Sequence, residues 1–239
     1  MITIIGTGHV FNLAEPVSFI VKNTWPDAVL IELDKARYET MMNDYNGVKP
    51  KGDQKMSAIY ANTAKYQQKM SEQSGSQLGG EFLAAVNTGK LVNADIIPID
   101  TDAMRVMNEM WDEMSASERL RYRLSGIKDS FGGIKKVENT HKKFAANEED
   151  YVESMRKRYP TLVRKLIDER NVYMADQINE LSEKYKNMVV VVGDAHVEGL
   201  CKLLKEEHIR KIRLSDIMDR EKMNRIRQMV WDGRETLEG

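Results

Sequence analysis

The chain has 239 residues, of which 41% are hydrophobic and 31% charged, and its 36 basic and 37 acidic side chains leave a formal net charge of −1. This balance argues against general electrostatic binding of nucleic acid. The single cysteine, Cys201, excludes an internal disulfide and a Cys-rich zinc site. No apolar run approaches the ~20 residues that span a bilayer, and the N-terminus lacks a signal-peptide pattern. We therefore expect a cytoplasmic protein without a membrane span or a nucleic-acid partner.

Strand-like and helix-like segments alternate along the first half of the chain. Short apolar runs without polar alternation are typical of strands that are covered on both faces of a sheet. In chain order we expect a strand at 2–5, a helix from 15, a strand at 28–33, a helix after 34, a loop at 43–53, an amphipathic helix at 56–70, a loop at 71–80 and a helix from 81. The helix at 56–70 carries an aromatic and methionine-rich stripe, which indicates packing on the body or an adaptable binding surface.

The second half of the chain is expected to be mostly helical before it returns to strands. The segment DIIPID, residues 95–100, indicates a strand, and Pro98 places it at an edge or at a strand end. Ser115 and Glu118 form a capping-box pattern, and a long amphipathic helix follows Pro160. The remaining elements are expected as helical structure over 103–186, a strand at 188–192, a helix at 197–207, a strand at 211–214 and a terminal helix from 216.

This order of elements predicts an α/β fold. Strands separated by helices favour a mainly parallel central sheet flanked by helices. Because strands come from both ends of the chain, we expect them to form one sheet, with a large helical insertion at about 103–186. The whole chain, 1–239, is expected to be a single domain, since no linker divides it.

One ten-residue phrase occurs twice, as MITIIGTGHV at 1–10 and as MVVVVGDAHV at 188–197, and it holds two of the four histidines, His9 and His196. In open α/β sheets, ligands bind at the carboxyl ends of the strands. If the two copies are neighbouring strands, both imidazoles face one pocket, as two metal ligands or as a base and its partner. The alternative is that each histidine only caps a turn. The other residues of the two turns expected to line this pocket are Gly6, Gly8, Gly193 and Asp194.

The second strand ends in the acids Glu32 and Asp34, and Arg37 and Tyr38 follow within one helical turn. This arrangement puts carboxylates at the same sheet edge as the histidines. Either acid could bind a metal or act as a general base, and Arg37 could hold a neighbouring carboxylate in a two-point pair. The alternative for these acids, Asp34 above all, is to cap the next helix.

Two further segments carry charged candidates. In GGEF, Gly80 and Glu81 lie at a helix start, where an acid is favoured by the helix dipole alone. In DER, Glu169 belongs to a charge run that is usually a solvated face. Arg170, however, shares a helical stripe with Met174 and Ile178. It therefore leans inward and needs a carboxylate, which Glu32 or Glu81 would supply.

The ordered set GTGHV, IELDKARY, GGEF, DERNVYMADQI and VVGDAHVEG resembles the TraB/PrgY family, which is related to the TIKI proteases and more distantly to the erythromycin-esterase and ChaN-like proteins. The resemblance runs from residue 2 to about residue 200. It implies an EreA/ChaN-like α/β fold in which His9, Glu32, Glu81 and His196 share one pocket, supported by Arg37, Tyr38 and Arg170. The chain departs from the family at Asp194, where small apolar residues are usual, and at Asn171, where an acid is frequent.

The resemblance implies a divalent-metal-dependent hydrolase acting on a peptide or amide bond. His9, His196, Glu32 and Glu81 would bind Mn, Co, Fe or Zn, with one glutamate activating the bound water. Two alternatives stay open. One is a metal-free esterase with a histidine general base, and the other is a protein that binds a peptide or cofactor without turnover, as in pheromone shutdown. The expected partner is a peptide or small-molecule substrate, with a homo-oligomer left open.

Overall fold

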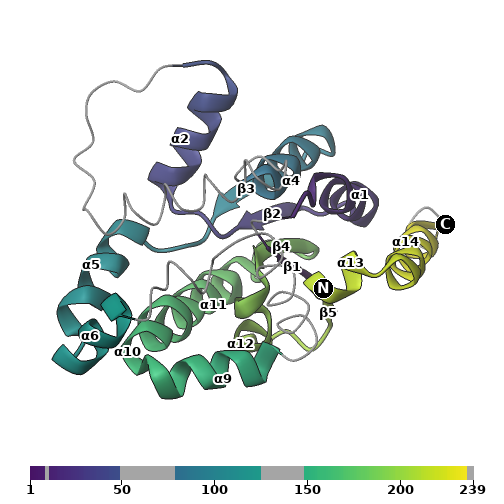
Figure 1. Cartoon of the computed structure of the whole chain (residues 1–239). Coiled ribbons are helices and arrows are strands. Elements are labelled where there is room, and N and C mark those ends of the chain that lie inside the picture. The colour runs from purple at the N-terminus through teal and green to yellow at the C-terminus, as the bar shows by residue number, and fades with distance from the viewer. Residues whose placement is uncertain (9–10, 49–78, 125–147, 236–239) are drawn as a thin grey trace.

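The computed structural model describes residues 1–8, 11–48, 79–124 and 148–235. Within this part lies a five-stranded, wholly parallel sheet with the strand order β3-β2-β4-β1-β5 (Figure 1). The α/β fold is therefore confirmed, and strands from both ends of the chain alternate in the centre of the sheet. The strands are β1 (Ile2–Thr7), β2 (Ala28–Ile31), β3 (Asp95–Pro98), β4 (Met188–Gly193) and β5 (Ile209–Ile212).

The two copies of the repeated phrase form neighbouring strands, as expected. β1 pairs with β4 in parallel, from Ile2 opposite Met188 to Thr7 opposite Gly193. This pairing is displaced by one residue from the alignment of the two phrases, so that Gly6 lies opposite Val192 rather than Gly193. The carboxyl ends of both strands nevertheless reach the same edge of the sheet.

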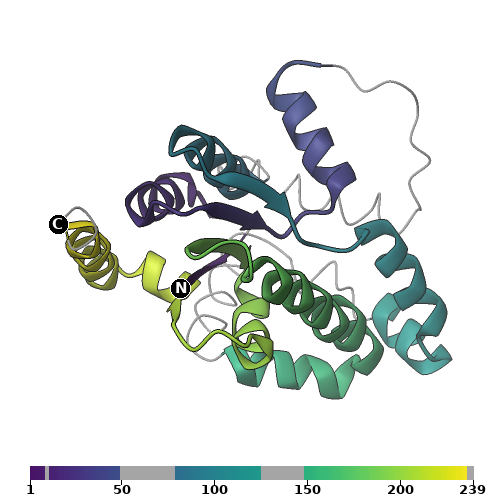
Figure 2. The same ribbon diagram turned by 180° about the vertical axis from the view of Figure 1, so that it is seen from behind.

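Helices cover both faces of the sheet, which explains why its strands lack polar alternation. Ile5 and Val191 belong to one apolar core with α1 (Ala14–Thr24), α4 (Gly80–Leu91), α13 (Leu214–Met218) and α14 (Arg220–Glu235). Ile4 and Val190 belong to a second core with α11 (Glu169–Leu181) and α12 (Asp194–Leu203). Figures 1 and 2 show these two layers on opposite sides of the sheet.

The connections of β1 and β4 run to opposite faces. β1 leads into α1 on one face, whereas β4 leads into α12 on the other. Two adjacent strands whose connections run to opposite faces form a topological switch point. In open α/β sheets, ligands bind in the crevice at the carboxyl ends of these two strands. The fold thus predicts a ligand-binding site near the ends of β1 and β4.

The remaining helices extend the molecule beyond the sheet. α2 (Lys35–Tyr45) buries no residue and stands away from the sheet in Figure 1. Its extent corrects the sequence prediction, because the helix runs into the loop expected at 43–53. The other helical segments are α5 (Ala103–Glu113), α6 (Ala116–Leu124), α9 (Glu148–Arg158), α10 (Pro160–Val163) and the π-helical turn η1 (Arg164–Asp168).

Several local predictions are confirmed and others need correction. Pro98 ends the edge strand β3, and Ser115 and Glu118 exchange both hydrogen bonds of a capping box. The helix expected at 197–207 begins three residues earlier and ends at Leu203. Its early start places His196 inside the first turn of the helix rather than in a preceding turn. The expected helix at 56–70 and the expected loop up to residue 78 lie outside the described residues.

Gly89 lies where α4 crosses β2 and β3 at close range. A Cβ at Gly89 would lie 2.7 Å from Ile96 Cδ1 and 2.9 Å from Val29 Cγ2. We expect Gly89→Ala to lower the free energy of unfolding by about 1–3 kcal/mol, because overpacking outweighs the better helix propensity of alanine. Chemical denaturation measures this. Leu91→Ala, at a position 83% exposed in the same helix, is the control, and a stabilised Gly89→Ala would contradict the close contact.

Candidate functional site

Four charged or titratable side chains meet at the carboxyl edge of the sheet. Glu32 follows β2, Asp100 follows β3, Arg170 lies in the first turn of α11, and His196 lies in the first turn of α12. Glu32, Asp100 and His196 are each at most 6% exposed, and the Arg170 side chain is 14% exposed. We call these four residues the edge cluster.

Arg170 connects the two carboxylates of the cluster. Its Nε and Nη2 donate to the two oxygens of Asp100 at 3.0 and 2.7 Å, and Nη2 also donates to Glu32 Oε1. Its Nη1 donates to the main-chain oxygen of Leu166, one turn earlier, at 3.0 Å. The predicted inward lean of Arg170 toward Glu32 is confirmed. The stronger, two-point partner is Asp100, which is not among the residues predicted for the site.

Glu32 is held in its ionised form. Its Oε2 accepts a hydrogen bond from the main-chain N–H of Gly193 at 2.6 Å, and its Oε1 lies 3.3 Å from His196 Nε2. Burial alone would raise the pKa of Glu32. His196, the Arg170 guanidinium and the Gly193 N–H together outweigh burial and hold this pKa well below its usual value.

The ring of His196 is hydrogen-bonded through both nitrogens. Nδ1 lies 2.7 Å from Asn171 Oδ1, and Nε2 lies 3.3 Å from Arg170 Nη1 as well as from Glu32. The ring is therefore fixed between α11 and the end of β2. His196 and Glu32 lie in contact, as predicted for two residues that share one pocket.

Asp194 has a structural partner instead of a place in the cluster. Its carboxylate accepts from Arg213 Nε at 3.0 Å, from Arg213 Nη2 at 2.9 Å and from the Leu214 N–H at 2.8 Å. A Cβ at Gly6 would lie 2.0 Å from Asp194 Oδ1, so only glycine leaves room for this carboxylate beside β1. Asp194 thus joins the start of α12 to β1 and to the end of β5.

The segment after β2 divides between the cluster and the next helix. Asp34 caps α2, accepting from the Arg37 N–H at 2.9 Å, which is the capping alternative. Arg37 reaches Asp100 Oδ2 with Nη1 at 3.4 Å, which is a single contact and not a two-point pair. Tyr38 is partly buried against the apolar core.

Three other predicted residues lie on α4 and α11. Glu169 pairs with Arg164 and Lys165, at 2.5 and 2.9 Å, and these partners are outside the edge cluster. Gly80 is the first residue of α4, and Glu81 is 2% exposed in its first turn. Because Gly89 places the other end of α4 near the start of β2 and β3, this first turn lies toward the carboxyl edge.

The turn after β1 is only partly described. Gly8 accepts a hydrogen bond from the Phe11 N–H at 3.1 Å, and a Cβ at Gly8 would lie 3.0 Å from Leu214. His9 lies outside the described residues. The predicted meeting of His9 with His196 therefore stays a prediction.

The predicted metal site can be compared with the donors that are described. In residues 1–8, 11–48, 79–124 and 148–235, no group of three or more His, Cys, Asp or Glu side chains could hold a metal ion. Arg170 already supplies the positive charge between Glu32 and Asp100, and its Nη1 faces the Nε2 of His196. The described donors therefore do not fit a divalent ion as they are arranged here, and a site that includes His9 stays a prediction.

Two residues of this site were not identified as members from the sequence. Asp100 is the second residue after β3 and Glu32 is the first residue after β2, so an acid just beyond an apolar strand is a usable signal for both. In the sequence, Asn171 stands out only as a departure from the family pattern. Its partner His196 is 25 positions away, so no local pattern indicated the contact.

The family model of the TraB/PrgY/gumN family matches residues 1–213, a range that includes all five strands and the edge cluster. The chain belongs to the TraB/PrgY/gumN family. An uncharacterized protein of Methanocaldococcus jannaschii is 27% identical over 212 residues, which cover 86% of this chain and 53% of that protein. The chain thus spans about half the length of this relative. No solved structure matches the chain.

Membership in this family was expected from the five ordered motifs and is confirmed. The motif residues Glu32, Arg170 and His196 come from three different motifs and meet in the edge cluster. Within the described part of this family member, no helix is both long and apolar enough to cross a membrane.

The lowered pKa of Glu32 makes stability depend on pH. Because the folded-state pKa lies below the usual value of 4.5, the stabilisation is present above that pH and is lost as the pH falls toward the folded-state pKa. We expect Glu32→Gln to cost about 3 kcal/mol of unfolding free energy at pH 7 and progressively less below pH 4.5. Denaturant titrations across this range test it. Glu180→Gln, on the exposed side of α11, is the control, and parallel pH profiles for Glu32→Gln and the unmodified chain would contradict it.

Proposed function

We propose that this member of the TraB/PrgY/gumN family is a hydrolase that acts on a peptide or amide bond. The observation that carries the proposal is the contact of an imidazole with a buried carboxylate, 3.3 Å apart, at the carboxyl edge of the sheet. Burying charged side chains costs free energy, and strongly perturbed carboxylates gather at functional sites. The His196–Glu32 pair supports acid–base chemistry at this edge.

The residues of the cluster have distinct proposed roles. His196 is the general base, taking a proton from the attacking water through Nε2, and Glu32 stabilises the imidazolium that forms. Arg170 keeps Glu32 ionised and is itself held by Asp100. Arg37 makes one contact with Asp100 and its side chain is 30% exposed, which leaves it better placed than Arg170 to polarise a substrate carbonyl. Glu81 is the alternative group for activating water.

A metal-dependent form of this hydrolase is the second candidate. His9, His196, Glu32 and Glu81 would hold Mn, Co, Fe or Zn, and such an ion would lower the pKa of a bound water. The arrangement of Arg170 speaks against this form, because the guanidinium would have to release Glu32. None of the roles proposed for the cluster depends on a metal.

A protein that binds a peptide or cofactor without turnover is the remaining alternative. One observation favours it. His196 is only 5% exposed and both of its ring nitrogens have partners, as in a rigid structural network. Because apo hydrogen bonds at an active site often rearrange when substrate binds, turnover has to be measured directly.

The first test is turnover of a quenched-fluorescent peptide library. We expect His196→Gln to lower kcat/KM about 100-fold or more, because general base catalysis contributes about 10²–10⁴ in rate. His208→Gln, at a side chain 83% exposed, is the matched control, and circular dichroism monitors folding. Peptides that bind stoichiometrically and are recovered intact would overturn the hydrolase and support the binder.

The second test separates the two forms of the hydrolase. The protein is purified without chelators, and bound metals are quantified by mass spectrometry. The metal-free form predicts no stoichiometric metal and an unchanged rate after EDTA treatment. About one equivalent of metal per chain, lost in both His9→Ala and His196→Ala, would overturn it in favour of the metal-dependent form.

A further inference from the structure

Asn171 contacts the edge cluster from behind. It is 4% exposed on α11, one residue after Arg170. Its Oδ1 lies 2.7 Å from His196 Nδ1, on the opposite side of the ring from Glu32 and Arg170. Among the described residues, His196 is the partner to which the Asn171 side chain hydrogen-bonds. The hydrogen bond of this amide is therefore made to the His196 ring.

We propose that Asn171 is a positioning residue that fixes His196 in the tautomer with its hydrogen on Nδ1 and its lone pair on Nε2. An amide oxygen only accepts hydrogen bonds, so the ring nitrogen facing it donates. In a neutral imidazole the other nitrogen then carries the lone pair. That nitrogen, Nε2, lies 3.3 Å from Arg170 Nη1, an N–H donor that the lone pair accepts. Glu32 Oε1, also 3.3 Å away, becomes its hydrogen-bond partner when Nε2 takes up a proton. The proposal rests on the proposed function in one respect, namely that Nε2 is the base.

Gly199 provides the space for this arrangement. A Cβ at Gly199 would lie 2.1 Å from Asn171 Nδ2 and 3.0 Å from Asn171 Cγ. Glycine inside a helix is unfavourable, and here it lets α12 approach the amide one turn after His196. Gly199, the last residue of the motif VVGDAHVEG, and His196 within the same motif thus both contact Asn171.

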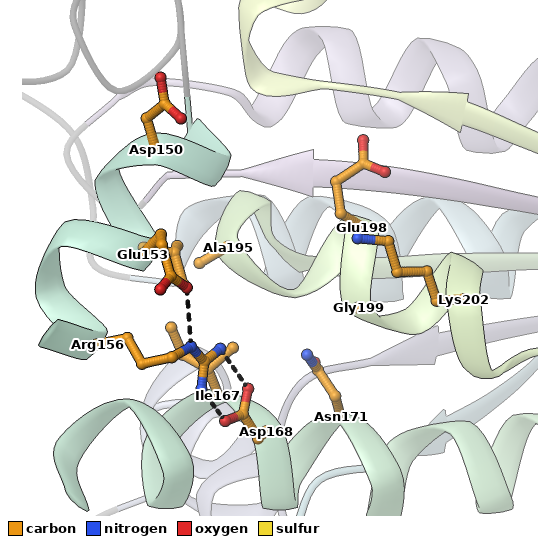
Figure 3. A pocket seen from close by; sticks show the side chains of 11 residues that line it. Asp150, Glu153, Arg156, Ile167, Asp168, Asn171, Ala195, Glu198, Gly199 and Lys202 are labelled. Carbon is orange, nitrogen blue, oxygen red and sulfur yellow. Dashed lines mark hydrogen bonds and ion pairs between the residues drawn. The ribbon is translucent and has the colours of Figure 1, made fainter. Parts of the chain in front are cut away.

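The assignment depends on which atom of the amide faces the ring. Asn171, Gly199 and Ala195 lie in the wall of a pocket of about 390 Å³ that also borders α9 (Figure 3). Among the described residues the amide nitrogen has no acceptor, whereas the amide oxygen has the ring. Turning the amide over would put its nitrogen against Nδ1 and reverse the tautomer, so the two orientations are distinguishable by experiment.

A purely structural role for Asn171 would tie α11 to α12 and nothing more. The chain offers a matched control for that role, because Asn179 on the same helix also ties α11 to the end of α12. It donates to the Leu203 oxygen at 3.3 Å and accepts from the Lys205 N–H at 3.0 Å. Asn179→Leu removes a similar connection without touching His196.

The experiment is long-range proton–nitrogen NMR of the ¹⁵N-histidine-labelled chain. The signals of His196 among the four histidines are identified by their loss in His196→Gln. We expect a protonated, pyrrole-type Nδ1 and a pyridine-type Nε2. Asn171→Leu, which removes the acceptor, and Gly199→Ala, which displaces it, are each expected to give a mixture of tautomers. Asn179→Leu is expected to leave the signals unchanged.

Activity supplies the second readout. Asn171→Leu is expected to lower kcat roughly ten- to hundredfold with little change in KM, whereas Asn171→Asp retains an acceptor and is expected to restore much of the rate. Asn179→Leu should keep the unmodified rate.

The outcomes separate this proposal from the proposed function. An Nε2–H tautomer in the unmodified chain overturns the role of Asn171, even if Asn171→Leu fails to fold. An unchanged tautomer and rate in a folded Asn171→Leu overturns it as well. An Nδ1–H tautomer that is lost in Asn171→Leu or Gly199→Ala, in a chain that hydrolyses no peptide, supports the positioning role and contradicts the hydrolase.

Discussion

The rest of this structure depends on the ion pairs that the Arg170 guanidinium forms with the carboxylates of Glu32 and Asp100. Glu32 and Asp100 follow the ends of neighbouring parallel strands, so their charges meet at one edge of the sheet. Both are buried, and without a cation their mutual repulsion and desolvation would be costly. Arg170 supplies that cation from α11. The helix must therefore lie on this face of the sheet with Arg170, Met174 and Ile178 turned inward together.

The same constraint organises the surroundings of His196. Arg170 directs Nη1 toward the ring, and the next residue, Asn171, holds the other side of it. One helix start thus provides both the cation for the carboxylates and the acceptor for the imidazole. At the beginning of α12, Asp194 turns to Arg213 instead. The two acidic groups near the ends of β2 and β4 therefore serve different purposes, one in the cluster and one in joining strands.

The sequence allowed the sheet, the family and the Glu32–Arg170 contact to be predicted, because each depends on a local pattern: apolar runs, ordered motifs, and an arginine on an apolar stripe. It did not reveal Asn171 or Gly199 as partners of the histidine, since their contacts depend on how two helices cross. The acids of IELD shared one pattern, yet Asp34 caps α2 while Glu32 enters the cluster. Strand alternation did not separate these roles, because β2 ends at Ile31.

Because β1 and β4 pair with a displacement of one residue, matching residues of the repeated ten-residue phrase do not lie side by side in the sheet. Side chains alternate between the faces of a strand, so an odd displacement sends matching letters to opposite sides. Ile4 belongs to the core beneath α11 and α12, whereas its counterpart Val191 belongs to the core beneath α1 and α4. The helices that follow the two strands leave in the same opposed directions. Each phrase places a glycine and a histidine near the end of a strand, but no symmetry operation of the molecule relates the two phrases.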